Sequence, residues 1–352
     1  MRERFFFYTF FGRGSEMAAD LLLTIVISLV TLLALAGLFQ FWSGWRDRTR
    51  RFPAPGRFVD IGGRRLHARI AGSGGPTVVF EAGISASSVN WSVLDREIAA
   101  ETTICSYDRA GLGWSDPPPR ASFSAGLVLR DLAELLDRLK LPEPYVLVGH
   151  SYGGLIARLF AERHPERVGG LVLVDPVLGC EWAHPTRAQD ALRVSAVRLT
   201  RVGELLARFG VVRLASSPAV LRSGIIPKLA ASHDVTEGVL SRLTAEMVKL
   251  PREIVPVFRS HWCRPKNFRA MTVHLRELPP SFAELREARL DCPVVVISAD
   301  NLSAEGLAEH RAIAALSARG EHVIAEGSGH WVQFDRPDMV VDAIRRVVRA
   351  AR

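Results

Sequence analysis

YVLVGHSYGGLIARLFAERH, residues 145–164, joins an apolar run to a helical pattern through the turn sequence Gly149-His-Ser151-Tyr-Gly153. YVLV is typical of a buried strand, and LIARLFAERH is typical of a helix. A sharp strand-to-helix turn needs small residues where the two backbones approach each other, and it exposes the side chain at its tip. The stretch therefore predicts a strand–turn–helix unit that presents the hydroxyl of Ser151.

Strand-like apolar runs alternate with amphipathic helical stretches on both sides of this unit. Near-continuous apolar strands separated by helices are typical of a parallel sheet covered on both faces. The first two runs flank Gly62-Gly63, which predicts an antiparallel hairpin at the start. The runs are FVDI (58–61), RLHARIA (65–71), TVVFEAG (77–83), TTICSYD (102–108), YVLVGHS (145–151), GLVLVD (170–175), PVVVISA (293–299) and EHVIAEG (321–327).

Two further motifs follow strands in the chain order of a known family. Tyr107–Ser115 reads YDRAGLGWS, and Gly327–His330 reads GSGH after the last strand. Together with the serine turn they resemble the α/β-hydrolase family, over essentially the whole chain from Phe58 onward. The resemblance implies an α/β-hydrolase fold with a mostly parallel, eight-stranded sheet flanked by helices.

The stretch 177–290 carries no comparable strand signal. It is rich in Leu, Val, Ala and Arg at helical spacing, and a structureless loop of this length would be unusual. We expect a helical lid inserted after the sixth strand, between two segments of the α/β-hydrolase core at 58–176 and 291–352. A helical packing layer without a gating role is the alternative.

Serine is a weak nucleophile at neutral pH, so a base must take its proton, and histidine suits that role. His330 follows the terminal strand, where the chain can bring it over the serine turn, whereas His150 should point away from Ser151. The resemblance implies Ser151 as nucleophile and His330 as general base. It also assigns the oxyanion hole to the backbone N–H groups of Ile84 and Tyr152.

Two carboxylates compete for the third position of the triad. Many relatives carry the acid a few residues past strand seven, but here Asp300 comes about two positions early for that role. A minority take it from the end of strand six, where Asp175 directly ends GLVLVD. We favour Asp175 and keep Asp300 as the alternative. Asp108 and Arg109 are expected to form a structural ion pair that braces their loop.

An uncharged apolar stretch lies near the N-terminus. Leu21–Phe39 reads LLLTIVISLVTLLALAGLF, long enough to cross a hydrocarbon core of ~30 Å as a helix. We expect one transmembrane helix over 21–42, an N-terminal flank at 1–20 and a linker at 43–57. The alternatives are a signal peptide with Ala34–Ala36 as its cleavage site, and a buried core helix.

Arginines on the two sides of this stretch predict its orientation. Three precede it, whereas a larger group follows it, so the positive-inside rule favours a cytoplasmic C-terminal domain. Met17 is a second candidate start, and beginning there would strengthen the same orientation. The arginines concerned are Arg2, Arg4 and Arg13 before the stretch and Arg46, Arg48, Arg50, Arg51, Arg57, Arg64 and Arg65 after it.

Composition argues against several other classes of function. The formal net charge is +8, but the basic residues are almost all Arg and are scattered, without the dense basic and aromatic block of a nucleic-acid site. The four cysteines show no C-x-x-C spacing, and the glycines around Gly72–Gly75 precede a strand. We therefore expect no metal site, no nucleotide or flavin cofactor, and no nucleic-acid partner.

The resemblance implies cleavage of a carboxylic ester or related acyl bond in a small, apolar substrate, with the N-terminal helix as a membrane tether. A serine at the turn disfavours dehalogenases and epoxide hydrolases, which need a carboxylate nucleophile. Other chemistries of the fold stay open: C–C bond hydrolysis, thioester hydrolysis and cofactor-free haloperoxidation. A non-catalytic, membrane-anchored binding protein is the alternative from another class.

Overall fold

β5, the strand that leads to Ser151, lies at the centre of an eight-stranded sheet of order β1-β2-β4-β3-β5-β6-β7-β8. The computed structural model describes residues 3–118, 124–183, 185–217, 220 and 249–352. The β1–β2 and β2–β4 pairs are antiparallel, and every other pair is parallel. The strands are β1 (Arg57–Asp60), β2 (Arg65–Ala71), β3 (Thr77–Glu81), β4 (Ile104–Tyr107), β5 (Tyr145–His150), β6 (Val168–Val174), β7 (Val294–Ala299) and β8 (Gly320–Ala325).

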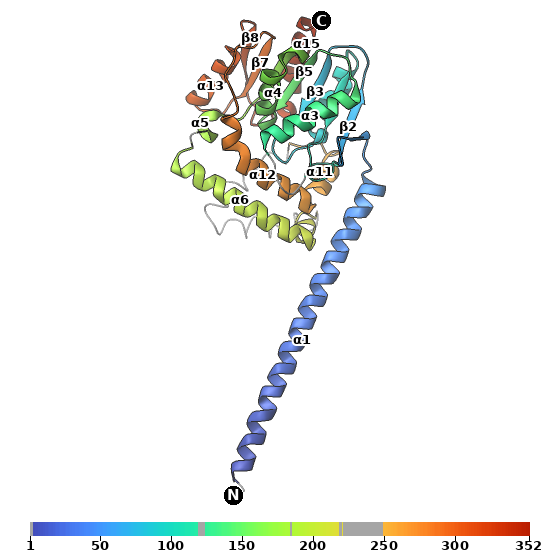
Figure 1. Cartoon of the computed structure of the whole chain (residues 1–352), viewed down its shortest axis with the longest axis vertical. Coiled ribbons are helices and arrows are strands. Elements are labelled where there is room, and N and C mark those ends of the chain that lie inside the picture. The colour runs from blue at the N-terminus through green and yellow to red at the C-terminus, as the bar shows by residue number, and fades with distance from the viewer. Residues whose placement is uncertain (1–2, 119–123, 184, 218–219, 221–248) are drawn as a thin grey trace.

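Helices lie on both faces of this sheet and beyond one end of it (Figure 1). The core helices are α2 (Ser92–Ala99), α3 (Ala125–Leu139), α4 (Tyr152–Arg163), α13 (Ala304–Ala314), α14 (Val332–Asp335) and α15 (Pro337–Ala350). Short 3₁₀ turns are η2 (Ser88–Trp91) and η3 (Pro165–Arg167). Between β6 and β7 lie α5 (Gly179–Trp182), α6 (Arg187–Arg208), α7 (Val211–Ala215), α11 (Val255–Trp262) and α12 (Pro265–Phe282).

The central strands are buried on both faces, so their alternating side chains feed two apolar cores. Leu147 belongs to the core under α3 and α4, whereas Val146 and Val148 belong to the core under α2 and α15. Successive side chains of a strand point to opposite faces, which explains the near-continuous apolar sequence of β5. The fold predicted from the sequence is confirmed: a mostly parallel sheet of eight strands flanked by helices.

The helices between β6 and β7 form a layer that we call the cap. Its two long helices, α6 and α12, pack against each other: Gly203 lies against the Phe268 ring, and the Thr272 hydroxyl donates to the Thr200 hydroxyl at 2.7 Å. Every described element of the predicted lid is helical. Positions 184, 218–219 and 221–248 of that prediction lie outside the described residues.

The N-terminal helix α1 (Glu3–Arg46) projects away from the rest of the molecule (Figure 1). It continues as a π-helical segment to Arg51, so the segment 43–57 predicted as a linker is helical over its first part, and the chain leaves the helix before Pro53. Among the described residues, one helical stretch, Ala19–Arg51, is long and apolar enough to cross a membrane. By length and composition it fits a membrane span or a signal sequence.

Candidate active site

Ser151 stands at the tip of the turn between β5 and α4 with φ 56° and ψ −121°, a conformation that non-glycine residues rarely adopt. The Ser151 N–H donates to the Val174 carbonyl oxygen at 3.1 Å, which ties the turn to β6. A Cβ on Gly153 would collide with the Glu81 carbonyl oxygen, so only glycine fits there. The turn sequence therefore forces the strained backbone that holds the Ser151 side chain at the tip of the turn, where it is buried.

His330 lies in the loop after β8 and reaches the serine turn. Its Nε2 is 3.1 Å from the Ser151 Oγ, and its Nδ1 is 2.6 Å from Asp175 Oδ2. A carboxylate can only accept, so Nδ1 carries the proton and Nε2 is left to accept from the serine hydroxyl. The His330 side chain is 44% exposed, whereas Ser151 and Asp175 are buried.

Asp175 directly follows β6 and is buried. Its φ of 42° is also unusual for a non-glycine residue, and its Oδ1 accepts from the Ala299 N–H at 2.9 Å. Burial alone would raise the pKa of Asp175, but the hydrogen bonds from His330 and Ala299 outweigh it and hold that pKa below its ordinary value. The carboxylate is therefore ionised and fixed against the imidazole.

Asp300, the alternative acid, forms hydrogen bonds with the start of the loop that carries His330. Its Oδ2 accepts from the Gly327 N–H at 3.0 Å, and its own N–H donates to the Ser328 carbonyl oxygen at 3.0 Å. Both bonds fasten the start of the loop that carries His330. The structure thus brings Ser151, His330 and Asp175 together, whereas Asp300 forms hydrogen bonds with Gly327 and Ser328.

The loop after β3 carries Ile84, one of the two predicted oxyanion donors, and lies against the serine turn. A Cβ on Gly83 would come 3.4 Å from the Ser151 Cβ. Tyr152, which carries the other predicted donor, is the first residue of α4, and first-turn N–H groups have no intrahelical acceptor. The two predicted donors therefore belong to segments that flank Ser151.

Arg109 binds the main chain of the loop that carries Ile84. Its guanidinium donates to the carbonyl oxygens of Ala82 and Gly83, the latter at 2.5 Å, and forms a buried ion pair with Glu81. Tyr107 also donates to the Glu81 carboxylate. This cluster was not predicted from the sequence, although a glutamate that ends a buried strand was a signal for it.

The predicted pairing of Asp108 with Arg109 is wrong, because each residue has another partner. Asp108 Oδ2 accepts from His67 Nδ1 at 2.9 Å, and its Oδ1 accepts from the Ser88 N–H at 2.7 Å. Burial opposes the ionised form of Asp108, but the contacts with His67 and Ser88 lower its pKa well below the ordinary value. Asp108 thus braces its loop through β2 and the η2 turn.

The His150 ring lies beside the His330 ring, with the two centroids 4.7 Å apart. Its Nε2 donates to the His330 carbonyl oxygen at 2.9 Å, so it supports the main chain of His330. Burial, reinforced by the neighbouring His330, lowers the pKa of His150 to about 3. The side chain is therefore neutral at physiological pH.

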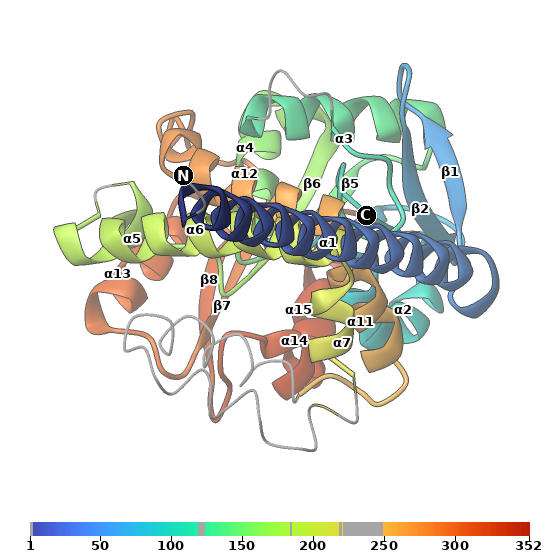
Figure 2. The same cartoon turned by 90° about the horizontal axis from the view of Figure 1, so that it is seen from below.

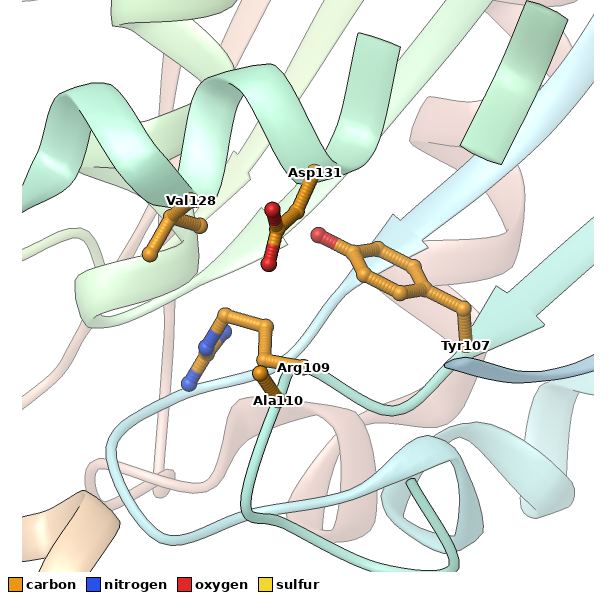
Figure 3. Close-up of a pocket in the computed structure, with 5 residues that line it drawn as sticks. All are labelled: Tyr107, Arg109, Ala110, Val128 and Asp131. Carbon is orange, nitrogen blue, oxygen red and sulfur yellow. The ribbon is translucent and has the colours of Figure 1, made fainter. Parts of the chain in front are cut away.

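A small hollow beside α3 is lined by residues other than the three that meet at Ser151 (Figure 3). Its lining is Tyr107, Arg109, Ala110, Val128 and Asp131. The hollow is too narrow to hold a ligand. Among the described residues, no cluster of three or more His, Cys, Asp and Glu side chains could hold a metal ion.

Comparison with known proteins places the chain in a family. Residues 76–337 match the family model described as alpha/beta hydrolase fold. The chain belongs to the α/β-hydrolase fold family. In this chain Ser151 follows β5, Asp175 follows β6 and His330 follows β8 of the sheet.

Relatives of known sequence carry several names within this family. The chain is 27% identical to the sn-1-specific diacylglycerol lipase ABHD11 of Mus musculus over 76% of this chain and 80% of that protein. It is 43% identical to the protein YqjL of Bacillus subtilis over 39% of this chain and 51% of that protein. It is 34% identical to a 2-hydroxymuconate semialdehyde hydrolase of Pseudomonas sp. over 35% of this chain and 44% of that enzyme. The match to YqjL thus spans about half of that relative's length.

Solved structures agree on the fold. An esterase from Thermogutta terrifontis superposes with a TM-score of 0.58 at 22% identity, over 84% of this chain and 99% of the esterase. A putative epoxide hydrolase from Pseudomonas aeruginosa superposes with a TM-score of 0.64 at 20% identity, over 84% of this chain and 97% of that enzyme. At these identities the likeness shows the α/β-hydrolase fold alone.

Proposed function

We propose that this α/β-hydrolase is a serine hydrolase that cleaves a carboxylic ester or a related acyl bond (EC 3.1.1) through an acyl-enzyme on Ser151. The observation that carries the proposal is the relay from Asp175 through His330 to the hydroxyl of Ser151, with contacts of 2.6 and 3.1 Å. A nucleophile, a base and a group that orients the base are the parts that acyl transfer needs.

Acylation begins with attack of the Ser151 Oγ on the substrate carbonyl carbon. His330 Nε2 takes the hydroxyl proton as the new C–O bond forms, and it then gives that proton to the leaving alcohol as the ester bond breaks. Asp175 keeps the second ring proton on Nδ1 and stabilises the imidazolium that forms between the two steps. Its ionised, buried carboxylate is suited to that role.

The negative charge of the tetrahedral intermediate develops on the former carbonyl oxygen. The backbone N–H groups of Ile84 and Tyr152 are the proposed donors to that oxygen, since their segments flank Ser151. Deacylation repeats the sequence with water in place of the alcohol: His330 activates the water, the acid leaves, and Ser151 regains its proton.

Ester chemistry is favoured over alkyl transfer by the residue at the turn. Dehalogenases and epoxide hydrolases need a carboxylate at this position to form an alkyl-enzyme, whereas this chain carries Ser151. The names of the lipase and esterase among its relatives are consistent with an apolar acyl substrate. A small-molecule ester with an apolar acyl group is therefore the proposed substrate class.

We also propose that α1 anchors the enzyme in a membrane as a single span, with the catalytic domain on the cytoplasmic side. The stretch Leu21–Phe39 is uncharged, and its large side chains are exposed, which would be unfavourable in water. The excess of arginines after the span supports the orientation.

Covalent labelling tests the catalytic proposal. The full chain in detergent micelles is incubated with a fluorophosphonate probe, and the labelled peptide is identified by mass spectrometry. We expect one adduct, on Ser151, and hydrolysis of a p-nitrophenyl ester that the adduct abolishes. Ser151→Ala should lose both label and hydrolysis, since Ala lacks the nucleophilic oxygen.

The control is the thermal unfolding midpoint of each variant, which shows whether the fold persists. Wild-type protein that unfolds cooperatively yet never reacts with the probe would contradict the proposal and favour a non-catalytic binding protein. An adduct on another serine, retained in Ser151→Ala, would contradict the assignment of the nucleophile.

A further inference from the structure

Over residues 197–208, α6 buries Val197 and its small side chains and exposes its other large apolar side chains. Val197, Thr200, Gly203 and Ala207 are buried, and Thr200 and Gly203 lie against α12. Large apolar residues at the same helical spacing are exposed on the opposite side and continue onto α7. We call this set the outer cap face: Leu199, Val202, Leu205, Leu206, Val211 and Leu214, which are 37% to 65% exposed.

This arrangement is the reverse of that in a water-soluble helix. A surface helix normally buries its large apolar stripe and gives its polar face to water, and contiguous exposed apolar patches mark interaction sites. Exposed arginines accompany the outer cap face on α6: Arg198, Arg201 and Arg208. An apolar stripe with flanking arginines is the pattern of helices that lie in the interface of a lipid bilayer.

The end of α1 is joined to the same part of the cap. The Phe39 ring lies against Gly210, the residue just before α7, and Gln40 Nε2 donates to the Cys263 carbonyl oxygen at 2.6 Å. Arg213 of α7 donates to Gln40 Oε1 at 3.0 Å and to Asp47 Oδ2 at 2.5 Å. These contacts fix the cap to the last turns of the apolar helix.

The position of these contacts along α1 indicates which part of the domain would lie at the membrane surface. The apolar run Leu21–Phe39 of α1 is long enough to span ~30 Å, and the polar Gln40 follows it, so the bilayer surface falls near the residues that contact Gly210. α6 runs across the end of the domain from which α1 projects (Figure 1). In the view from that end, α1 crosses in front of α6, and the two helices are in contact (Figure 2). A bilayer crossed by α1 would therefore meet the outer cap face.

We propose that the outer cap face docks on the bilayer that α1 spans, with its apolar side chains in the headgroup–acyl boundary and its arginines among anionic headgroups. This inference rests on the proposed anchoring by α1 and is independent of the proposed hydrolase chemistry. The docked cap holds the catalytic domain against the lipid surface, from which an apolar ester would reach it.

Site-specific fluorescence tests the docking. The full chain carries Cys180→Ser and Cys292→Ser, which remove the two half-buried thiols, and a single new cysteine labelled with a polarity-sensitive dye. Leu205→Cys and Leu214→Cys probe the outer cap face, and Leu29→Cys probes the middle of α1. Arg352→Cys is the matched control, because the C-terminus lies at the opposite end of the domain (Figure 1).

The labelled chains are reconstituted in vesicles of phosphatidylcholine and phosphatidylglycerol. We expect the Leu205 and Leu214 labels to shift their emission to the blue and to lose intensity when the lipids carry a quencher near the headgroup. The Arg352 label should keep the emission of a dye in water. The Leu29 label should be quenched by a quencher deep in the acyl chains.

Each of the other outcomes contradicts the docking and shows whether the membrane anchoring by α1 still holds. A quenched Leu29 label with Leu205 and Leu214 labels in water overturns the docking and leaves the anchor intact. An unquenched Leu29 label overturns both. Labels at 205 and 214 that are shielded from aqueous iodide yet not reached by lipid quenchers identify a second copy of the chain as the occupant. Hydrolase activity enters none of these readouts.

Discussion

Arg109 Nη2 donates to the carbonyl oxygen of Gly83 at a distance of 2.5 Å. That carbonyl and the N–H of Ile84 belong to one trans peptide, in which the C=O and the N–H point in opposite directions. Holding the oxygen on one side therefore fixes where the Ile84 N–H points. If Ile84 is an oxyanion donor as proposed, we expect Arg109 to be a positioning residue that acts on it through the backbone.

Removing this hold should slow the chemical step more than substrate binding. In the double variant Arg109→Met/Glu81→Gln we expect kcat to fall roughly 10- to 100-fold, less than the 10²- to 10³-fold loss of a whole oxyanion donor. The KM should stay close to that of wild type, because the transition state loses more than the ground state. Steady-state kinetics with a p-nitrophenyl ester measure both.

Glu81→Gln alone is the matched control. It leaves the Arg109 bonds to Ala82 and Gly83 in place, so kcat should stay near wild type. Either single substitution leaves one charge of the buried pair without its partner, at about 3–5 kcal/mol, so the thermal unfolding midpoint must show that Glu81→Gln is folded before its kcat is compared. A stable double variant with wild-type kcat would contradict the positioning role.

Asp175 and Asp300 offer a matched pair of substitutions for the third triad position. Asp175→Asn loses the acceptor that selects the Nδ1–H tautomer of His330, so we expect kcat to fall on the order of 10⁴-fold. Asp300→Asn keeps an oxygen for the Gly327 N–H and should retain most of the activity. Measuring kcat for ester hydrolysis by both variants distinguishes the two carboxylates. A larger loss of kcat in Asp300→Asn than in Asp175→Asn would assign the acid to Asp300.

The sequence alone predicts the sheet and the serine turn because both are local patterns. The apolar runs mark all eight strands, and the Gly-x-Ser-x-Gly turn needs only its own neighbours to be recognised. The choice between Asp175 and Asp300 is different. It depends on how strands far apart in the sequence pair, since Val174 lies beside Ile297 and thereby brings Asp175 to the Ala299 N–H.

Two other features could not be predicted from the sequence alone, for a similar reason. Arg109 follows Asp108 directly, which suggested a pair, but Arg109 reaches Glu81 on β3 and Asp108 reaches His67 on β2. Such partners depend on the strand order. In α6 the periodicity reveals apolar residues on two sides of the helix, and only the packing against α12 tells which side faces inward.

A substitution at Gly153 tests the close packing at the serine turn. A Cβ at this position would collide with the backbone carbonyl oxygens of Glu81 and Ala82, which cannot move without displacing β3. We expect Gly153→Ala to destabilise the fold by roughly 3 kcal/mol or more. The thermal unfolding midpoint of the full chain in micelles measures this loss.

Gly126 in α3 provides the opposite control. A Cβ there makes only ordinary contacts, the nearest at 3.5 Å from the Ser124 Oγ, and Ala is the better helix former. Gly126→Ala should raise stability by about 0.4–1 kcal/mol. Equal midpoints for Gly153→Ala and Gly126→Ala would contradict the close approach at the turn.

His150 links the stability of the site to pH. Its pKa is about 3 in the folded protein, because of burial and the nearby His330, against roughly 6.5 for an unperturbed histidine. Between these two values the unfolded chain binds the additional proton. Stability therefore rises with pH across this window, and it falls by up to about 1.4 kcal/mol per unit as the pH drops below 6.5.

His150→Gln removes this titration and keeps an N–H donor for the His330 carbonyl oxygen. Wild-type protein should lose about 2 kcal/mol more than the variant between pH 7 and pH 5, which is the difference expected from the two pKa values. Denaturant unfolding of the full chain in micelles at the two pH values measures it. Because each chain is compared with itself, any fixed cost of the substitution cancels, so equal pH dependence in the two chains would mean that His150 takes up a proton as readily in the folded protein as in the unfolded one.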